Sequence, residues 1–316
     1  MGTLETIEHD VTLTRIGTQL YRYPTLTGNA TGNFAATSDD DGVIHPEVVI
    51  SDRGNDEETF GFVDGREIRG IAPGNINFVD TRVGSGTESD SGDDLLIAPF
   101  FQPDVTIHGT ELGDSFLVAS TLFPVTIESH GGNDAVMIGS SNAAANGNLN
   151  EIDARLNLKT GAGQDRIFVN DQAFDTREVG YRLSTSGIKD VVKYPSVRDT
   201  ILDDVAAYPN HFADINFEGV EFARVNGSAT QKNSFLVLPS TFTRFFVDGI
   251  AQTNTEDTVT VLGFSESRSL IHENGDGAFT FEEDALQVHF AGIEDVNQTS
   301  FVSVDGFFEG SLEPFE

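Results

Sequence analysis

The chain contains no cysteine and no tryptophan, and it carries little positive charge. Without cysteine, disulfide bridges and thiol chemistry are excluded. The longest apolar stretch, residues 95–101, is too short to cross a bilayer, so we expect no membrane insertion. The first ten residues lack the basic start and apolar segment of a secretory signal. We therefore expect export, if it occurs, to use a signal peptide that is not present here, or another route.

The charge is strongly one-sided, with 51 acidic and 18 basic residues and a formal net charge of −33. Such a chain repels nucleic acids and anionic membrane surfaces, so its expected partners are cations, neutral polymers and other proteins. A surface rich in carboxylates and poor in lysine is typical of salt adaptation and also of calcium binding. Composition does not separate these two explanations. The hydrophobic content of 38% favours a folded protein, in which the 25 phenylalanines supply the bulky core residues.

An internal repeat organises the middle of the chain. Residues 105–120 and 125–140 share Val, Thr, Ile, Gly, Asp and Ser at an offset of 20, and the same spacing connects Asp94, Asp114 and Asp134. Each copy consists of a short alternating strand, a turn of Gly, Asn, Ser or Thr that closes on Asp or Asn, and a second short strand. Looser copies close their turns at Asp56, Asp165, Asn233 and Asp257.

A second pattern, apolar-any-Phe-any-Gly-apolar-Glu, occurs at residues 215–222 and 288–295. Helical signals are weak by comparison. The best of them, residues 197–209, has apolar residues at roughly helical spacing and ends at a proline. The pattern as a whole predicts an all-β protein with at most one short helix.

The repeat predicts a right-handed parallel β-helix or β-roll-like solenoid with coils of about 20 residues. A unit of this size cannot bury its apolar face alone and must stack on its neighbours. The constant offset predicts that Val105 lies beside Val125 and Phe116 beside Val136 on adjacent coils. A β-sandwich is the alternative, because short strands at regular spacing are also typical of that fold.

We divide the chain into an N-terminal cap or edge segment (1–45), a solenoid body (46–300) and an acidic C-terminal tail (301–316). Within the body, residues 171–214 lose the repeat pattern and are predicted to form an insertion or a widened coil. We also hypothesise that the alternating stretch 11–23 pairs with the strand edge of a neighbouring subunit and propagates a fibre.

Stacked turn carboxylates repel one another by about 1 kcal/mol for each neighbouring pair in water, and more when desolvated. The turns contain almost no basic residues, so a bound cation is the expected counter-charge. Calcium takes six to eight oxygen ligands, and glycine gives the turn the backbone freedom to direct carbonyls at one point. The alternative is an Asx-type turn without metal. The candidate calcium ligands are Gly161, Gly163, Asp165, Gly132, Asn133, Asp134, Asp114 and Asp94.

The sequence "GAGQDRI" at residues 161–167 resembles the repeats-in-toxin (RTX) calcium-binding motif G-x-G-x-D-x-apolar, with Thr160 at the position of the family's first glycine. "HGGNDAVMI" at residues 130–138 is similar to a shortened copy. The resemblance implies a parallel β-roll of a large bacterial cell-surface or extracellular protein, with calcium held between turns by Asp and Gly carbonyls. In that family the repeats follow every nine residues, whereas here the turns recur about every 20. We therefore expect a wider coil with at most a few calcium sites.

The expected function is that of a calcium-stabilised extracellular or cell-surface module with a structural, adhesive or self-assembling role, as in a fibre or surface layer. Its expected partners are copies of itself, other surface proteins or glycans, and not nucleic acid.

The alternative is a polysaccharide lyase or hydrolase on a β-helix. In a lyase, calcium would neutralise a uronate, and Arg155, Lys159 or Arg166 would take the proton. No known catalytic motif is present. The seven histidines stand singly in the sequence and are interpreted as surface or strand residues, since a metal role needs convergent partners.

Overall fold

The computed structural model describes residues 11–16, 19–21, 36–38, 44–53, 56–65, 67–71, 76–80, 104–139, 147–190, 211–250, 256–262, 267–271, 276–281 and 286–299. Every regular element in these ranges is a β-strand. Within the same ranges no helix is long and apolar enough to cross a membrane. The possible helix at 197–209, the tail at 301–316 and Asp94 lie outside the described residues. The described part of the protein is thus all-β, as the sequence predicts.

Two large mixed sheets contain the strands of the described residues. The first sheet has 13 strands, which in spatial order are β2 (Gln19–Tyr21), β1 (Val11–Ile16), β7 (Ile76–Asp80), β6 (Glu67–Arg69), β5 (Phe60–Asp64), β9 (Ser115–Val118), β11 (Ala135–Ile138), β13 (Arg166–Asn170), β17 (Phe222–Asn226), β19 (Arg244–Asp248), β23 (Val288–Ala291), β22 (Gly277–Phe281) and β21 (Ser267–Ile271).

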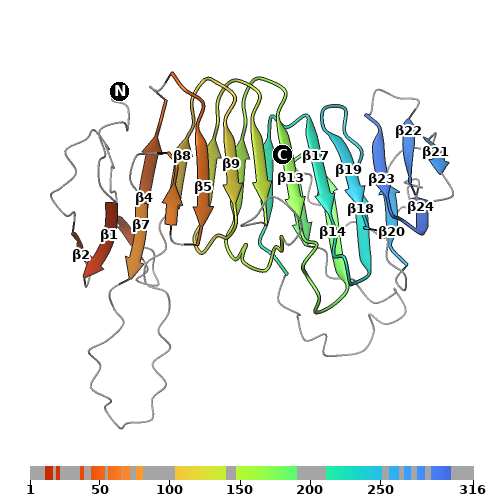
Figure 1. The fold of residues 1–316 in the computed structure, drawn as a ribbon, viewed down its shortest axis with the longest axis horizontal. Coiled ribbons are helices and arrows are strands. Elements are labelled where there is room, and N and C mark those ends of the chain that lie inside the picture. Colours follow the sequence, from red (N-terminus) through yellow and green to blue (C-terminus); the bar gives the residue numbers. More distant parts are fainter. Residues whose placement is uncertain are drawn as a thin grey trace, which may run out of the picture.

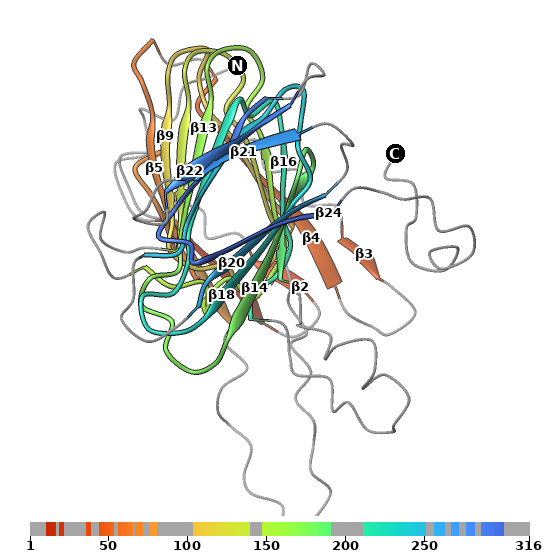
Figure 2. The same cartoon turned by 90° about the vertical axis from the view of Figure 1, so that its right-hand side faces the viewer.

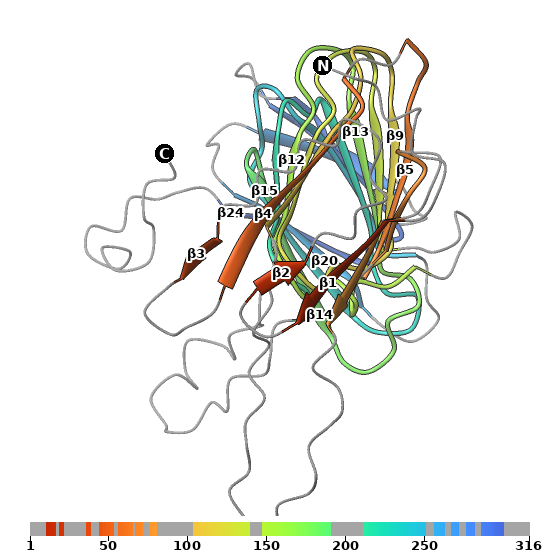
Figure 3. The same cartoon turned by 90° about the vertical axis from the view of Figure 1, so that its left-hand side faces the viewer.

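The second sheet has 11 strands, which in spatial order are β24 (Asp295–Thr299), β20 (Thr258–Leu262), β18 (Asn233–Val237), β14 (Val179–Ser184), β15 (Gly187–Asp190), β16 (Ile215–Glu218), β12 (Leu156–Lys159), β10 (Val125–Glu128), β8 (Asp104–His108), β4 (Ile44–Ser51) and β3 (Ala36–Ser38). The strands succeed one another along the long axis of the molecule (Figure 1), and views along that axis show the two sheets facing each other (Figures 2 and 3).

From β8 to β13 the chain alternates between the two sheets, so that each strand pairs in parallel with the strand two elements away. The pairing places Val105 beside Val125 and Phe116 beside Val136. Both neighbour pairs predicted from the repeat are therefore confirmed. Val105 and Val125 occupy the same inward position on adjacent strands, and so do Phe116 and Val136.

Among the described residues, equivalent turn residues are 20 positions apart at one place only. This spacing separates Asp114 from Asp134, whereas the next step to Asp165 takes 31 residues and the step from there to Glu221 takes 56. Part of the longest step is explained by β14 and β15, an antiparallel pair that lies between β16 and β18 in the second sheet. The expectation of uniform 20-residue units is corrected in this respect: strand register is kept while the connections vary in length.

The core lies between the sheets and consists of side chains in register from strand to strand. Ile107, Ile127 and Leu158 are neighbours on β8, β10 and β12, and each is at most 1% exposed. Burying one such side chain contributes about 1.5–3 kcal/mol. Because alternate residues of a strand face opposite sides, the residue after each of these core positions faces outward.

The N-terminal strand β1 pairs in parallel with β7 and antiparallel with β2, so both of its edges are used inside its own sheet. β2, in the same stretch, is the terminal strand of the first sheet, and the hypothesis that residues 11–23 pair with a neighbouring subunit stays a prediction.

Candidate functional site

The predicted turn aspartates form a buried ladder at one edge of the two sheets, each just before a strand of the first sheet. Asp114, Asp134 and Asp165 are 0%, 1% and 0% exposed. The backbone N–H of Asp114 donates to Oδ1 of Asp134, and the N–H of Asp134 donates to Oδ1 of Asp165, both at 2.8 Å. The N–H of Asp165 donates to Oε2 of Glu221 at 2.7 Å. We call these four residues the first carboxylate ladder.

Further donors surround the ladder. Thr110 donates its N–H to Oδ2 of Asp114 at 2.7 Å and its hydroxyl to Oδ1 at 2.8 Å. The hydroxyl of Ser129 donates to Oδ2 of Asp134 at 2.5 Å. A hydrogen bond to a charged acceptor contributes about 1.5–3 kcal/mol. The mutual repulsion that predicted a cation is thus offset in part by N–H and O–H donors of the protein itself.

Burial raises the pKa of Asp134 to about 6, and the nearby carboxylates of Asp165 and Asp114 act in the same direction. The hydrogen bonds from Ser129 and from the Asp114 N–H oppose this rise but do not cancel it. Protonation of Asp134 near pH 6 therefore relieves part of the charge in the ladder.

Asp165 differs from the other aspartates, because its Oδ2 is buried and has no hydrogen-bond partner. Oxygens of the neighbouring turns are already engaged: Oδ1 of Asn133 accepts from the N–H of Gln164, and the His130 carbonyl accepts from that of Ala162. A calcium shell of six to eight oxygens needs several such acceptors at once. Among the described residues, Asp165 Oδ2 is the buried side-chain oxygen without a hydrogen-bond partner, and a calcium ion there would need neighbouring oxygens to exchange their hydrogen bonds.

The turn glycines are explained by close stacking. A Cβ on Gly161 would lie 1.6 Å from the carbonyl oxygen of His130, and one on Gly163 would lie 1.5 Å from that of Gly132. Gly132 itself has a φ of 103°. No other residue fits these positions, whether or not a metal is bound.

The position before Asp114 in the ladder belongs to Thr59, whose N–H donates to Oδ1 of Asp114 at 2.8 Å. The 20-residue spacing assigned this position to Asp94. β5, which directly follows Thr59, pairs in parallel with β9, which directly follows Asp114. Asp94 itself lies outside the described residues.

A second ladder lies before strands of the second sheet and contains Asn233, Asp257 and Glu294. The N–H and side-chain amide of Asn233 donate to Asp257 at 2.7 and 3.0 Å, and the N–H of Asp257 donates to Oε2 of Glu294 at 2.8 Å. Burial is the main cause that raises the pKa of Asp257 to about 6. Glu221 and Glu294 are the glutamates of the repeated Phe-any-Gly-apolar-Glu pattern, and each accepts the aspartate N–H at the end of its ladder. This explains why that pattern recurs.

The three basic residues considered for a lyase do not converge. Arg155 precedes β12 and Lys159 ends it, so their Cα atoms are about 13 Å apart at the usual strand rise. Arg166 begins β13 in the other sheet. The ammonium group of Lys159 forms an ion pair with Glu128 at 2.8 Å.

One buried histidine contacts an aspartate, as in many catalytic sites. Nε2 of His211 lies 2.8 Å from Oδ2 of Asp171, and the Tyr181 hydroxyl donates to the same oxygen at 2.6 Å. The side chains of His211 and Asp171 are only 2% and 0% exposed. A substrate cannot reach them, so we interpret the group as part of the core.

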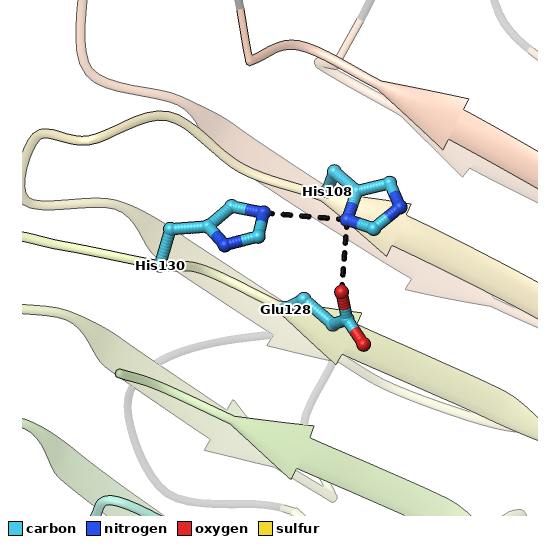
Figure 4. A group of neighbouring side chains, drawn as sticks. All are labelled: His108, Glu128 and His130. Atoms are coloured by element: carbon cyan, nitrogen blue, oxygen red, sulfur yellow. Dashed lines mark hydrogen bonds and ion pairs between the residues drawn. The ribbon is translucent and has the colours of Figure 1, made fainter. Parts of the chain in front are cut away.

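A partly exposed group of two histidines and a glutamate lies on the outer face of the second sheet. Nδ1 of His108 is 3.1 Å from Oε2 of Glu128 and 3.3 Å from Nε2 of His130 (Figure 4). The two imidazole rings are stacked, with centroids 5.4 Å apart and planes 14° apart. One ligand atom from each of the three residues lies within 4.8 Å of the others. We call this group the histidine–glutamate cluster.

The strands explain why these residues meet. β8 and β10 pair in register, so that His108 lies directly beside Glu128. Both directly follow a buried isoleucine and therefore face outward. His130 follows two residues later in the turn with a φ of 74°, a left-handed conformation that few non-glycine residues adopt.

Both imidazoles are biased toward the neutral form. Desolvation lowers the pKa of His108 and of His130, and Arg53 acts in the same direction on both, whereas Glu128 opposes it. The hydrogen bond from Lys159 lowers the pKa of Glu128, which favours its carboxylate form. Neutral imidazole and carboxylate are the metal-binding forms of these side chains.

Sequence reasoning missed the histidine–glutamate cluster because it treated each histidine separately. The signal was present in the repeat, since the 20-residue offset that aligns Val105 with Val125 also aligns His108 with Glu128. A search for metal-ligating residue types at equivalent repeat positions would have found this pair. The position of His130 depends on the turn and was not accessible in this way.

Comparison with protein-family models, with curated proteins and with solved structures finds no match for this chain. The resemblance to RTX repeats therefore rests on the motif residues alone.

Proposed function

We propose that this chain is a structural module of an extracellular or cell-surface protein, built as a right-handed parallel β-helix or β-roll-like solenoid. Its role is to present a long, regular surface for adhesion or self-assembly, with other surface proteins, glycans or further copies of the chain as partners. The observation that carries the proposal is the use of the buried turn carboxylates as acceptors for the N–H groups of the preceding turn.

The solenoid is supported by the strand order. Between β8 and β13 successive strands alternate between the sheets, and the parallel register is unbroken within each sheet. In a sandwich built from hairpins, strands adjacent in sequence would pair with each other. Here the strands adjacent in sequence over this region lie in opposite sheets.

A structural role is supported by the chemistry of the ladders. Their carboxylates are buried and engaged by backbone and hydroxyl donors, which is how a scaffold uses buried charge. A catalytic carboxylate instead needs access to a substrate. The lyase alternative gains no support from Arg155, Lys159 and Arg166, since they lie apart.

Calcium is the cation that we propose for the turns, centred on Asp165. The free Oδ2 of this residue is the group that a cation would satisfy, and the cost of leaving a buried charged oxygen unpaired is at least about 1–3 kcal/mol. Residues Gly161 and Gly163 belong to the same turn.

Thermal unfolding in excess EDTA and in millimolar calcium tests this proposal. We expect calcium to raise the Tm of the natural chain, and Asp165→Asn to remove that rise while the circular dichroism spectrum stays β-rich. Asp257→Asn, in the second ladder, is the matched control and should keep the calcium response. An unchanged Tm in the natural chain would refute the calcium part alone.

The structural role is tested separately by incubation with acidic polysaccharides. We expect no unsaturated uronate absorbance with the natural chain. Product formation that is lost in Lys159→Ala or Arg166→Ala would overturn the structural interpretation in favour of a lyase.

A further inference from the structure

We propose that the histidine–glutamate cluster of His108, Glu128 and His130 is a site for a divalent transition-metal ion of the zinc type, separate from any calcium in the turns. It would connect two neighbouring strands, β8 and β10, and the turn that follows them. The proposal does not depend on calcium binding or on the surface role.

The distances fit a small metal ion. Zinc binds imidazole nitrogen at about 2.0–2.1 Å, so two ligand atoms of a tetrahedral site lie roughly 3.3 Å apart. Nδ1 of His108 lies 3.1 Å from the carboxylate of Glu128 and 3.3 Å from Nε2 of His130. The ligand atoms of Glu128 and His130 lie within 4.8 Å of each other, so binding one ion would draw these two side chains closer together.

When both imidazoles are neutral, each placement of the His130 proton leaves one unfavourable contact in or beside the cluster. Arg53 can only donate, and its Nη2 lies 3.4 Å from Nδ1 of His130; if Nδ1 accepts from Arg53, the proton of a neutral His130 is on Nε2. His130 then donates to the single lone pair of His108 Nδ1, so this nitrogen carries no proton to donate to the Glu128 carboxylate 3.1 Å away. The opposite assignment sets the N–H of His130 against the N–H of Arg53. A cation between the three ligand atoms resolves the conflict inside the cluster.

Glu128 is held in place for this role from its other side. Lys159 donates to Oε1 at 2.8 Å, which leaves Oε2 directed at His108. Such an outer hydrogen bond orients a ligating carboxylate. Because the side chains of His108 and Glu128 are 19% and 24% exposed, water can complete the coordination shell.

Arg53 opposes metal binding. Its guanidinium group adds positive charge beside His130 and faces the nitrogen that must carry a proton once Nε2 binds the ion. The side chain is 40% exposed and lies 4.0 Å from the carboxylate of Glu111, so it has an alternative partner away from the cluster. Removing Arg53 should therefore strengthen binding.

The ligand types separate this site from a calcium site. Two imidazole nitrogens and one carboxylate are the ligands of zinc and related ions, whereas calcium prefers oxygen throughout. Calcium should not compete at the histidine–glutamate cluster.

The test is titration of the EDTA-treated, untagged full chain with zinc chloride, followed by isothermal calorimetry. We expect one strong site per chain, with Kd raised roughly 100-fold or more in His108→Gln and in His130→Asn. Asparagine is chosen at position 130 because it tolerates the left-handed backbone of that turn. Arg53→Gln should lower Kd by roughly tenfold, since it removes one repelling charge.

Two controls distinguish this site from weak binding to the acidic surface. His289→Gln changes a partly exposed histidine on β23 in the other sheet, and it should leave Kd unchanged. Cobalt(II) should give visible absorption bands with the natural chain that are absent in His130→Asn. Circular dichroism verifies that each variant is folded.

The proposal is overturned if zinc binds with equal affinity to the natural chain and to both histidine variants, or if no strong site is found. Displacement of zinc by millimolar calcium would also contradict it. A calcium-dependent Tm without zinc binding would support the turn site and refute this one, so the two proposals fail independently.

Discussion

The same turns hold two groups of opposite character: the first carboxylate ladder, which faces the core, and the histidine–glutamate cluster, which faces the solvent. Asp134 is 1% exposed and accepts two hydrogen bonds from protein donors, whereas Glu128, six residues earlier, is partly exposed and forms ion pairs. Asp114 and Asp134 of the ladder lie in the turns that follow β8 and β10, the two strands that carry His108 and Glu128. The difference shows that the direction of a side chain decides whether a carboxylate stabilises the fold or remains available to a ligand.

The largest loss of stability is expected for Asp134→Ala. It removes the acceptor of the Asp114 N–H and of the Ser129 hydroxyl, and it leaves both donors buried. We expect a loss of roughly 3 kcal/mol in the free energy of unfolding, measured from urea denaturation. Glu128→Ala is the matched outward substitution, and a loss as large as that of Asp134→Ala would contradict the distinction between the two faces.

Asn233→Asp tests why the second ladder has an amide where the first has a carboxylate. The change replaces the donor Nδ2 by an oxygen that faces the carboxylate of Asp257. We expect a loss of roughly 2 kcal/mol at pH 7.5 in chemical denaturation, with partial recovery at pH 5 as one of the two acids is protonated. An unchanged stability at pH 7.5 would show that the amide is not needed for this ladder.

The pH dependence of stability is a further property that distinguishes the buried Asp134 from the outward-facing Glu128. The pKa of Asp134 is raised to about 6 in the folded protein. The folded state then binds a proton more tightly than the unfolded state, so this group adds stability as pH falls from above 6 toward 4 and loses it as pH rises through 6. Between pH 7.5 and 5 the gain is on the order of 1 kcal/mol.

The control for this prediction is Asp134→Asn, whose amide can donate to Ser129 while its oxygen still accepts from Asp114. We expect the variant to fold and to lose the part of the pH dependence that belongs to Asp134. Denaturation midpoints at several pH values measure it. If natural chain and variant show the same slope, the burial of Asp134 does not control its protonation.

The smallest effect is expected on the outer face without metal. Glu128→Gln removes the ion pair with Lys159, whose side chain is 54% exposed. Exposed pairs contribute about 0–1 kcal/mol, so the denaturation midpoint should change little. A large change in EDTA would mean that this face stabilises the fold even without a ligand.

Much of the fold was predictable from particular residues. Matching residues in the 105–120 and 125–140 segments predicted parallel neighbours, and Val105 and Phe116 pair with the residues expected. The separations between the later ladder residues could not be predicted in this way. The steps from Asp134 to Asp165 and from there to Glu221 span 31 and 56 residues, because a strand register can be kept across a connection of any length. Thr59 likewise lies beside Asp114 in the ladder, although a long connection separates the two residues in the chain.

The sequence by itself determined that the protein is all-β, that certain strands are neighbours, and that Asp114, Asp134 and Asp165 share an edge, because inward residues and turn residues must repeat when strands stack. Only the tertiary structure decided what these carboxylates contact. It engaged them with N–H groups of the preceding turn and with hydroxyl groups of their own turns, left one oxygen of Asp165 free, and brought His130 to His108 and Glu128. The physical reason is that hydrogen bonds and metal geometry depend on distances of a few tenths of an ångström, which backbone packing sets and residue spacing does not.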